Sequence, residues 1–521
     1  MPLASPWPSL APYPTEPAWT FLARAAQRTP HQPAVIGLDG QSATYGELWD
    51  RSRRLARFLQ RDANVVPGDT VAVAAPGSRD TAAILHAAWL AGARVSFLNA
   101  FQRPAEMAHY LADAEVAVAF VSASAAPALN EARQLADFQC LRHVYRSAQV
   151  WDLTDAEPPR PEPIAVDPAR QDALLVYSSG TTGWPVAARQ SHLNRVAAAR
   201  QRLAVLPLPR GTVVLSLRPF WTDISCCIAA RVPLVTGADP QPAAIRAALQ
   251  QHRVTLLMAR PTSVQALLDS AANGAAELGT LRVIECSGAP LPAPVAAMAE
   301  RAGVAIVQSY QMTQAPAVNF TPLADRRPAS VGPPVPDTEE RLVDPATGRE
   351  VGPGETGEVW IRGPQVMLGY WRHPAATAAT LLPDGWLRTG DLGRFDANGY
   401  LYLMDRLKAL IKVGGWPVYP AEIEASLLTH PAVREAAVVA VPSPTRGEQP
   451  LAFVVLRAER HVEPAQLLGW LAERLAPYKI PRSIDVLDSL PKGAGGKVLR
   501  RELEERARRA YGSPGDGTPL A

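Results

Sequence analysis

The chain has 521 residues, too many for one ordinary hydrophobic core, so at least two domains are expected. Hydrophobic residues make up 47% and charged residues 19% of it, a composition typical of globular rather than disordered proteins. The 52 Lys and Arg nearly balance the 49 Asp and Glu, and a net charge of +3 favours neither a nucleic-acid partner nor an anionic membrane surface.

The amino-terminal segment MPLASPWPSLAPYP is rich in proline and is predicted to be extended. It lacks the basic and apolar regions of a secretory signal, and no apolar run in the chain is long enough to predict a membrane span. No CxxC pair or zinc-like spacing occurs, so the cysteines are predicted to be reduced and buried: Cys140, Cys226, Cys227 and Cys286. We therefore expect a soluble, cytoplasmic protein.

A helix is predicted over residues 19–26, and an alternation of strand-like and helix-like runs follows between residues 33 and 120. Within it, residues 70–75 and 116–121 read as strands and residues 80–90 as a helix. The alternation recurs from residue 213 to about residue 307. This pattern predicts an α/β fold with two βαβ-type subdomains built on mostly parallel sheets.

From residue 339 the strand-like segments are separated by Gly, Pro and Asp turns, which predicts a small, more antiparallel and barrel-like portion. A compact α+β segment is expected at residues 422–508, with strands at 436–441 and 452–456. The predicted domains are therefore a large domain at residues 1–404, a small domain at 405–510 and a disordered tail at 511–521.

A hydroxyl- and glycine-rich segment, YSSGTTGWP, follows the apolar residues 173–176. Its glycines would let backbone N–H groups approach phosphate oxygens, and its hydroxyls add further donors, although an ordinary polar turn has the same composition. It is not a Walker A loop. The GPGETG segment at residues 352–357 spells a dinucleotide-binding pattern but lacks the strand-to-helix context, so it is not taken as one.

Further motifs follow in the carboxyl-terminal half. SYQMTQ comes after the strand-like residues 304–307, and WLRTGDL is expected to place Asp391 in a tight turn. Asp405 and Arg406 follow the strand-like residues 400–404. The glycine-rich segment LPKGAGGKVLR carries Lys497, which its flanking glycines would allow to swing.

In this order, and together with TYGEL, GDTVAVAAPGS, ECSGAPL and GEVWIRGPQVMLGYW, these motifs resemble the adenylate-forming superfamily of AMP-binding enzymes. That superfamily includes acyl- and aryl-CoA synthetases, nonribosomal-peptide adenylation domains and luciferases. The resemblance covers nearly the whole chain. It implies a large AMP-binding domain followed by a small, mobile lid domain that carries a catalytic lysine.

The resemblance also implies a role for individual residues. Lys497 would bridge the attacking carboxylate and the α-phosphate of ATP, Thr313 would contact that phosphate, and Asp405 would be the hinge of the lid. The β- and γ-phosphates would be held by Ser178, Ser179, Gly180, Thr181, Thr182 and Gly183. The adenosine would be held by Gly288, Ala289, Pro290, Ser309, Tyr310, Gln311, Met312, Asp391 and Arg406. Mg²⁺ would lie near Thr182 and Gln314.

The chain departs from the superfamily pattern at several positions. Val186 stands where a phosphate-binding lysine is usual, and Gln314 replaces the glutamate that helps to hold Mg²⁺. Gln311 replaces a glycine that borders the acid pocket and is expected to shrink or polarise that pocket. Trp221 is expected to wall the pocket and Asp223 to meet a polar substrate, although both could instead be ordinary packing residues.

These residues predict an AMP-forming ligase that uses ATP and Mg²⁺ to convert a small, aromatic or polar acid into an acyl-adenylate. Transfer to CoA is the simplest second step. Two alternatives remain. One is a specialised biosynthetic enzyme with an amine or carrier-protein acceptor, or one that activates nitrite. The other is a degenerate nucleotide-binding protein, which the losses at Val186 and Gln314 favour and the retention of Asp391, Arg406 and Lys497 opposes.

Overall fold

The computed structural model describes residues 3–100, 102, 104–135, 138, 140–154, 163–177, 185–237, 241–271, 278–327, 329–413, 416–443, 446–458, 460–493 and 498–511. The predicted phosphate loop at residues 178–183, Lys497 and most of the predicted tail lie outside these ranges. The chain divides into two compact units: a first unit of Met1–Arg341 and Trp360–Arg388, and a second of Leu342–Val359 and Thr389–Ala521.

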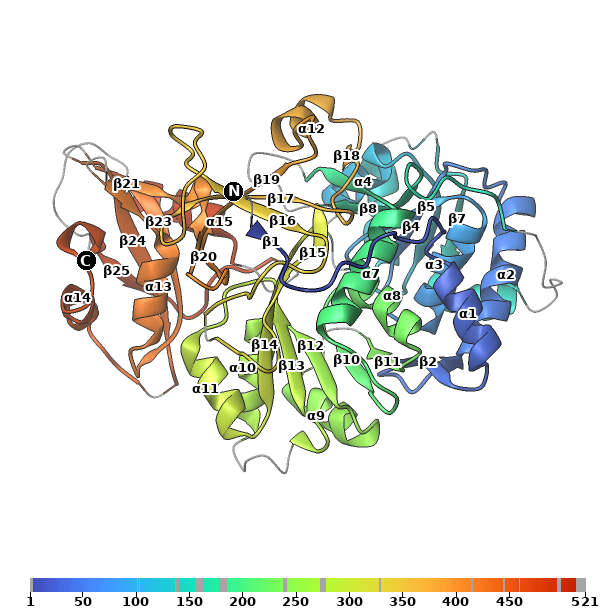
Figure 1. The fold of residues 1–521 in the computed structure, drawn as a ribbon, viewed down its shortest axis with the longest axis horizontal. Helices are drawn as coiled ribbons and strands as arrows, with labels where there is room; N and C mark the ends of the chain where they lie inside the picture. The colour runs from blue at the N-terminus through green and yellow to red at the C-terminus, as the bar shows by residue number, and fades with distance from the viewer. Residues whose placement is uncertain are drawn as a thin grey trace. The chain divides into compact units, whose positions relative to one another are not determined.

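The first unit contains a seven-stranded sheet with five parallel strands (Figure 1). Its order is β18 (Gly369–Tyr370), β9 (Ala187–Ser191), β8 (Asp172–Tyr177), β5 (Arg94–Phe97), β4 (Thr70–Ala74), β6 (Val116–Val121) and β7 (His143–Arg146). Strands β9 and β18 are antiparallel to their neighbours. Every residue of β4 and β6 is buried, as expected for parallel strands covered on both faces.

An eight-stranded sheet in the same unit has β10 to β14 and β2 in parallel, with an antiparallel strand at each edge. Its order is β15 (Ala315–Phe320), β14 (Ala305–Met312), β13 (Val283–Ser287), β12 (Leu256–Ala259), β10 (Val214–Ser216), β11 (Leu234–Thr236), β2 (Pro33–Gly37) and β3 (Ser42–Thr44). Strands β2 and β3 come from the first predicted βαβ stretch but join the second sheet. The two stretches are therefore not two separate sheets.

The helices of the first unit cover both sheets: α1 (Thr20–Arg28), α2 (Tyr45–Arg61), α3 (Arg79–Leu90), α4 (Pro104–Asp113), α5 (Ala126–Leu135), α6 (Val150–Leu153), α7 (His192–Val205), α8 (Phe220–Ala230), α9 (Pro242–Gln251), α10 (Pro261–Ser270), α11 (Ala293–Arg301) and α12 (Pro374–Thr380). One continuous hydrophobic core contains side chains from both sheets and from α1, α2, α3, α7 and α8, which places these helices between the sheets. Two further cores line the outer faces, one with α9 to α11 and one with α4 and α5.

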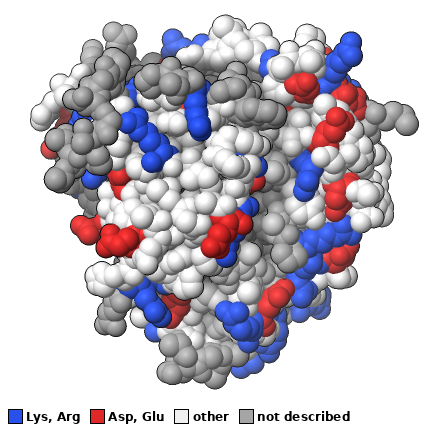
Figure 2. All heavy atoms as spheres, turned by 90° about the vertical axis from the view of Figure 1, so that its left-hand side faces the viewer, with Lys and Arg blue, Asp and Glu red and all other residues white. Residues whose placement is uncertain are grey.

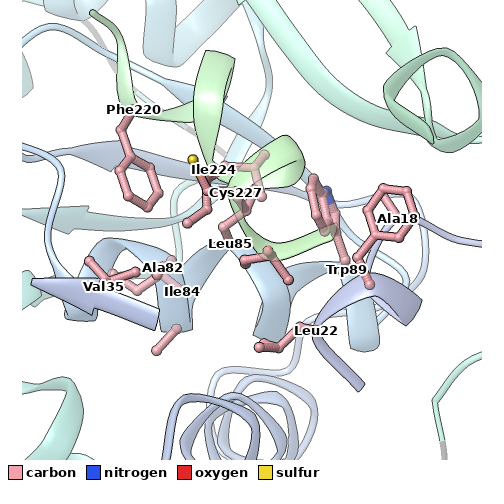
Figure 3. Close-up of a cluster of buried hydrophobic side chains, with 14 of the residues drawn as sticks. Ala18, Leu22, Val35, Ala82, Ile84, Leu85, Trp89, Phe220, Ile224 and Cys227 are labelled. Atoms are coloured by element: carbon pink, nitrogen blue, oxygen red, sulfur yellow. The ribbon is translucent and has the colours of Figure 1, made fainter. Parts of the chain in front are cut away.

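Helix α3 lies at the centre of the shared core and is buried along its length from Thr81 to Leu90. Figure 3 shows its side chains meeting those of α8, α1 and β2; the labelled residues of these four elements are Ala82, Ile84, Leu85, Trp89, Phe220, Ile224, Cys227, Leu22 and Val35. An apolar surface on all sides suits a helix that meets protein on all sides. Helix α8 is thereby anchored on its apolar face, and Trp221 in its first turn packs against the same core.

A five-stranded sheet forms from the turn-rich region and the amino-terminal segment, in the order β1 (Leu3–Ala4), β16 (Glu339–Val343), β17 (Gly357–Arg362), β19 (Leu387–Phe395) and β20 (Leu401–Arg406). The pairs β1–β16 and β19–β20 are antiparallel, as the turn composition predicts for this region. The expected tight turn at Asp391 was wrong. Asp391 lies within β19, where Gly390 adopts a positive φ of 70° inside the strand rather than reversing the chain.

The second unit contains an α+β portion. Its sheet is formed by β22 (Trp416–Val418), β21 (Ile411–Val413), β24 (Gly447–Leu456), β23 (Val433–Ser443) and β25 (Ile484–Val486). Its helices are α13 (Pro420–Leu428), α14 (Pro464–Ala472) and α15 (Arg500–Tyr511), and the sheet carries a hydrophobic core on each face. Tyr511, predicted to open the disordered tail, is instead the last residue of α15, and its hydroxyl donates to Asp485 at 2.9 Å.

Figure 2 shows Lys and Arg side chains interspersed with Asp and Glu on the displayed face, rather than gathered into a field of one sign. This agrees with the balanced composition. Within the described ranges, no helix combines the length and the apolar character needed to cross a membrane. Three of the four cysteines, Cys226, Cys227 and Cys286, are buried and free as predicted, whereas Cys140 is exposed because it lies outside the core.

Candidate active site

The carboxyl ends of β10, β12, β13 and β14 share one edge of the eight-stranded sheet, where ligands usually bind in α/β proteins. Strand β13 ends at Ser287 and is followed by the exposed residues Gly288, Ala289 and Pro290. Gly288 has a φ of 87°, a left-handed conformation that glycine adopts without strain. The neighbouring β14 pairs Ser309 with Ser287. The residues predicted to hold adenine therefore lie directly after β13 and on the adjacent strand β14.

The SYQMTQ motif continues β14 further than the sequence suggested, because Ser309 to Met312 are still in the strand. Ser309 Oγ donates to Glu285 Oε1 at 2.8 Å, and Tyr310 is buried with its hydroxyl 3.8 Å from Met312 Sδ. The chain then turns at Thr313, whose carbonyl accepts from Gln190 Nε2 at 2.7 Å. The backbone at the predicted α-phosphate contact is thereby fixed to β9.

Gln314 lies at the predicted magnesium position. Its side-chain Nε2 donates to the Tyr370 hydroxyl at 2.8 Å, and its backbone carbonyl accepts from the Met367 backbone N–H at 2.8 Å. The side-chain amide oxygen of Gln314 is the only atom of that side chain that can ligate a cation, and it is neutral. Thr182 lies outside the described residues. This donor set fits a Mg²⁺ ion held chiefly by ATP phosphates and water, with Gln314 Oε1 as a weak protein contact.

The two ends of the predicted phosphate loop are anchored as neighbours. Tyr177, the last residue of β8, pairs with Ala187, the first residue of β9. Burial, together with the hydrogen bond of 2.7 Å from the Tyr177 hydroxyl to Asp113, raises the pKa of that phenol and keeps it neutral. Val186 directly precedes β9, so the position lacking the usual lysine lies where the loop returns to the sheet.

The predicted ribose-binding pair lies in the second unit, where Asp391 of β19 stands opposite Arg406 of β20. Arg406 Nε lies 3.0 Å from Asp391 Oδ1, and the Asp391 backbone N–H donates to Thr389 Oγ1 at 3.0 Å. Asp391 is buried, whereas the side chain of Arg406 is 48% exposed. The antiparallel register thus brings together two residues that are 15 positions apart in the sequence.

Asp405, the predicted hinge, is the partner of Leu392 in the same strand pair. Its carboxylate accepts from the backbone N–H groups of Ala421 at 2.9 Å and Arg406 at 2.7 Å. Ala421 is in the first turn of α13, so Asp405 satisfies one of the free N–H groups at the start of that helix. Burial raises the pKa of Asp405 despite these hydrogen bonds.

Sequence reasoning missed a buried charge cluster behind the adenine segment, which we call the four-charge cluster: Arg202 of α7, Arg218 after β10, Asp223 of α8 and Glu285 of β13. All four side chains are at most 8% exposed. Each arginine contacts both acids, with N–O distances of 2.6 to 3.0 Å. The signal was present in the sequence, because Glu285 interrupts the otherwise apolar strand that ends in Ser287.

Asp223 was expected to meet a polar substrate, but the structure gives both of its oxygens internal partners. Oδ1 accepts from Arg202 Nη1 at 2.7 Å and Arg218 Nη2 at 2.6 Å, while Oδ2 accepts from Ser216 Oγ at 2.6 Å and Arg218 Nε at 3.1 Å. Burial alone would raise the pKa of Asp223, but the two guanidinium groups outweigh it and lower that pKa. Asp223 is therefore an ionised member of the four-charge cluster.

Trp221 is half-buried and stacks on Phe97, with ring centroids 4.7 Å apart and planes inclined by 17°. Its backbone carbonyl accepts a hydrogen bond from Arg195 Nη2. Arg195 is buried without a carboxylate partner among the described residues, and burial lowers its pKa to about 10. This arrangement fixes the first turn of α8, which is consistent with Trp221 forming a wall.

The profile of a family described as AMP-binding enzyme matches residues 22–371, which include the predicted phosphate and adenine segments. A second profile, described as AMP-binding enzyme C-terminal domain, matches residues 422–497 and ends at the predicted catalytic lysine. The chain belongs to the AMP-binding enzyme family. As an AMP-binding enzyme it is an AMP-forming ligase that uses ATP.

Individual relatives cover almost the whole of this AMP-binding enzyme. A feruloyl-CoA synthase from Amycolatopsis sp is 36% identical over 492 residues, which span 93% of this chain and 97% of that protein. Among solved structures, ATP-bound MatB from Rhodopseudomonas palustris superposes with a TM-score of 0.88 at 28% identity, covering 95% of this chain and 100% of that one. The anthranilate CoA ligase AuaEII, in complex with anthranoyl-AMP, gives a TM-score of 0.89 at 26% identity, with coverages of 96% and 99%.

Proposed function

We propose that this AMP-forming ligase converts an organic acid into its CoA thioester through an acyl-adenylate. A carboxylate oxygen of the acid attacks the α-phosphorus of ATP, and the bond to the β-phosphate breaks with release of pyrophosphate. The CoA thiol then gives up its proton and attacks the acyl carbon, and AMP leaves with the oxygen that came from the acid. One site thus serves two displacements.

The ribose pair carries this proposal. Asp391 and Arg406 are held opposite each other at 3.0 Å by the β19–β20 register, and the carboxylate oriented in this way would accept hydrogen bonds from the ribose hydroxyls. Lys497 would place its ammonium group between the acid and the α-phosphate, where negative charge builds up in the transition state. Thr313, fixed through its carbonyl by Gln190, would contact the same phosphate.

The choice of CoA rests on the relatives, because feruloyl-CoA synthase and anthranilate CoA ligase are named for CoA chemistry on aromatic acids. A small, aromatic or polar acid is therefore the proposed substrate class. Gln311, at the predicted border of the acid pocket, and Trp221, as its predicted wall and stacked on Phe97, would restrict the space for a long alkyl chain.

A second candidate keeps the adenylate and changes the acid or the acceptor. Val186 supplies no cation at the end of the phosphate loop, and the Gln314 amide supplies no charge for Mg²⁺. These departures favour a specialised biosynthetic enzyme, with an amine or a carrier-protein thiol as acceptor, or with nitrite in place of a carboxylic acid.

Acid-dependent exchange of pyrophosphate into ATP tests the adenylating half-reaction. We expect exchange with at least one member of a panel of aliphatic, aromatic and polar acids and nitrite. We expect Lys497→Ala to reduce it by at least 100-fold, about 2.7 kcal/mol of transition-state stabilisation. Omitting Mg²⁺ should abolish it. Nucleotide binding without exchange for any acid would instead indicate the degenerate binding protein.

The acceptor is tested with the acid that gives exchange. Thioester formation with CoA at a rate at least tenfold above that with amines or carrier proteins supports the CoA ligase. A preference for another acceptor would assign the chain to the second candidate and leave the adenylating step intact.

A further inference from the structure

A cavity of about 380 Å³ lies at the edge of the seven-stranded sheet where its parallel strands begin, and we call it the amino-edge cavity. Strands β5, β4, β6 and β7 are neighbours in that sheet, and the cavity is bordered by residues at or just before their first positions. Ligand pockets in proteins commonly measure roughly 300 to 1,000 Å³, so a small molecule fits this one. The lining residues that matter here are Gly68, Asp69, Arg94, Glu115, Cys140 and Arg142.

The amino-edge cavity is separate from the candidate active site. The predicted phosphate loop follows Tyr177, the last residue of β8, and β8 runs parallel to β5, β4, β6 and β7. The carboxyl end of β8 and the first residues of the other four strands therefore lie at opposite edges of the sheet. The five residues of β4 alone span about 16 Å. A molecule bound in the cavity would lie across the sheet from the phosphate loop.

Two ion pairs border the cavity, and both leave polar atoms available to a ligand. Arg142 Nη2 donates to Asp69 Oδ2, and Arg372 Nη1 lies 3.0 Å from Glu115 Oε1. Within the part of the chain that the structure describes, Arg142 Nη1, Asp69 Oδ1 and Glu115 Oε2 have no hydrogen-bond partner. The cavity thus offers N–H donors of a cation and oxygen acceptors of two anions.

Arg94 is the buried cation of the cavity, with a side chain that is 12% exposed. Its Nε donates to Thr70 Oγ1 at 2.8 Å, and its guanidinium carbon lies 3.9 Å from the centre of the Trp371 ring. Its Nη1 is 3.8 Å from Asp172 Oδ2, which is too long for a hydrogen bond. Burial lowers the pKa of Arg94, and nearby carboxylates, Asp172 above all, oppose that shift. Arg94 is therefore a fixed, charged group with N–H donors to spare.

The charged groups of the lining balance one another, because Arg94 and Arg142 face Asp69 and Glu115. A simple anion or cation would meet repulsion as well as attraction in such a cavity, whereas a molecule carrying both charges can pair with both signs. A guanidinium matches the planar geometry of a carboxylate. A carboxylate oxygen without a partner accepts from an N–H group, which a primary ammonium supplies.

We propose that the amino-edge cavity binds a free α-amino acid. Arg94 and Arg142 hold its carboxylate, and Asp69 and Glu115 accept hydrogen bonds from its ammonium group. This site goes beyond the proposed function, since the ligand takes no part in the adenylating reaction.

The position of Cys140 makes occupancy of the cavity measurable. Cys140 lines the cavity and is exposed, whereas Cys226, Cys227 and Cys286 are buried. The uncharged reagent N-ethylmaleimide should therefore modify Cys140 first. We expect at least one of glycine, alanine, leucine and phenylalanine, at about 10 mM, to slow this modification at least threefold and in a saturable way, as for a Kd of about 1 mM or below.

Matched ligands test whether both charges are read. Propionate is alanine without its amino group, and ethylamine is alanine without its carboxylate; the same pairs exist for leucine and phenylalanine. Neither partial molecule should slow the modification by more than 1.5-fold at the concentration at which the amino acid protects. Equal protection by the carboxylate alone would overturn the proposal, because the cavity would then be a simple anion site.

Variants test whether the amino acid binds in this cavity. Arg142→Gln and Glu115→Gln remove one charge of each sign, and each should raise the calorimetric Kd of the protecting amino acid at least tenfold. Arg133→Gln, at an exposed arginine of α5 outside the cavity, is the matched control and should leave that Kd within twofold. Should one cavity variant fail to fold, the other carries the test.

Two results would overturn the proposal: no calorimetric binding of any of the four amino acids at about 10 mM, or binding that both cavity variants leave unchanged. The second result would place the amino acid elsewhere, including in the candidate active site. Pyrophosphate exchange should stay within twofold of the wild type in Arg142→Gln and Glu115→Gln, because the cavity lies across the sheet from the phosphate loop. Failure of the amino-acid site therefore leaves the proposed function untouched.

Discussion

At the scale of single residues, Glu340 is a fully buried carboxyl group with no cationic partner in the described part of the chain. Among the described residues it meets Asn319 Nδ2 at 3.1 Å, while its Oε1 and Asn319 Oδ1 both lack a hydrogen-bond partner. Burial raises the pKa of Glu340 to about 8, although the Asn319 hydrogen bond opposes this, so the group is protonated in the folded protein at neutral pH.

Glu340→Gln is therefore expected to reduce the loss of stability at high pH. The folded pKa lies above the unfolded value of 4.5, so the stability from the protonated group is complete below pH 4.5 and is lost as the pH rises toward about 8. The difference is on the order of 5 kcal/mol in the free energy of unfolding. The urea midpoint of unfolding should fall between pH 5 and pH 8.5, and the fall should be smaller in Glu340→Gln than in the wild type. An equal fall would contradict a protonated Glu340.

The motif residues stand out in the sequence because local chemistry constrains them: a phosphate loop needs glycines and hydroxyls, and a swinging lysine needs flexible neighbours. Their roles stay predictions, because residues 178–183 and Lys497 lie outside the described residues. The partners of Asp223 could not be predicted in this way. Its oxygens are filled by Arg202, Arg218 and Ser216, which are close only because α7, α8 and β10 meet in the fold. A buried carboxylate and a substrate-binding one look the same in a sequence.

At the scale of elements, Asp405 joins a strand to a helix, since it lies in β20 and accepts from the first turn of α13. The proposed hinge therefore also has a structural role, and the two roles need separate variants. Asp405→Ala removes the carboxylate and leaves the backbone free, whereas Asp405→Pro also restricts φ. Losing the carboxylate alone should cost about 1 kcal/mol of stability, as for other helix caps.

If Asp405 is the hinge, Asp405→Pro should keep pyrophosphate exchange within about threefold of Asp405→Ala and slow thioester formation by a further tenfold or more. Single-turnover measurements of the two half-reactions supply both numbers. An equal loss of the two half-reactions in Asp405→Pro would mean that the residue supports the fold and is not a hinge.

The observed strand bounds show where the hydrophobic pattern of the sequence predicts a strand's length and where it does not. The strand at residues 116–121 was predicted with its observed bounds because both of its faces are buried and its sequence is uniformly apolar. Strand β14 was predicted too short, since Ser309 and Gln311 are polar residues whose side chains bond to Glu285 and Ser287 inside the protein. Internal polar partners are not visible in a hydropathy pattern.

At the scale of the whole molecule, the α/β class and the two-part organisation follow from the alternation of strands and helices and from the turn-rich stretch after residue 339. The sequence pattern does not predict that β2 and β3 join the second sheet, because parallel pairing joins strands far apart in the chain. The boundary at residue 405 stays a prediction. In this structure residues 389–404, which lie before it and include most of β19 and β20, belong to the compact second unit.

The fate of the acid's oxygen tests the adenylate most directly. With the acid that supports exchange, labelled with oxygen-18 in its carboxylate, and CoA as acceptor, one labelled oxygen should appear in the phosphate of AMP and none in pyrophosphate. That follows because the carboxylate oxygen attacks the α-phosphorus and stays with AMP when the thiol displaces it. Thioester formed alongside unlabelled AMP, or with label in pyrophosphate, would contradict an acyl-adenylate intermediate.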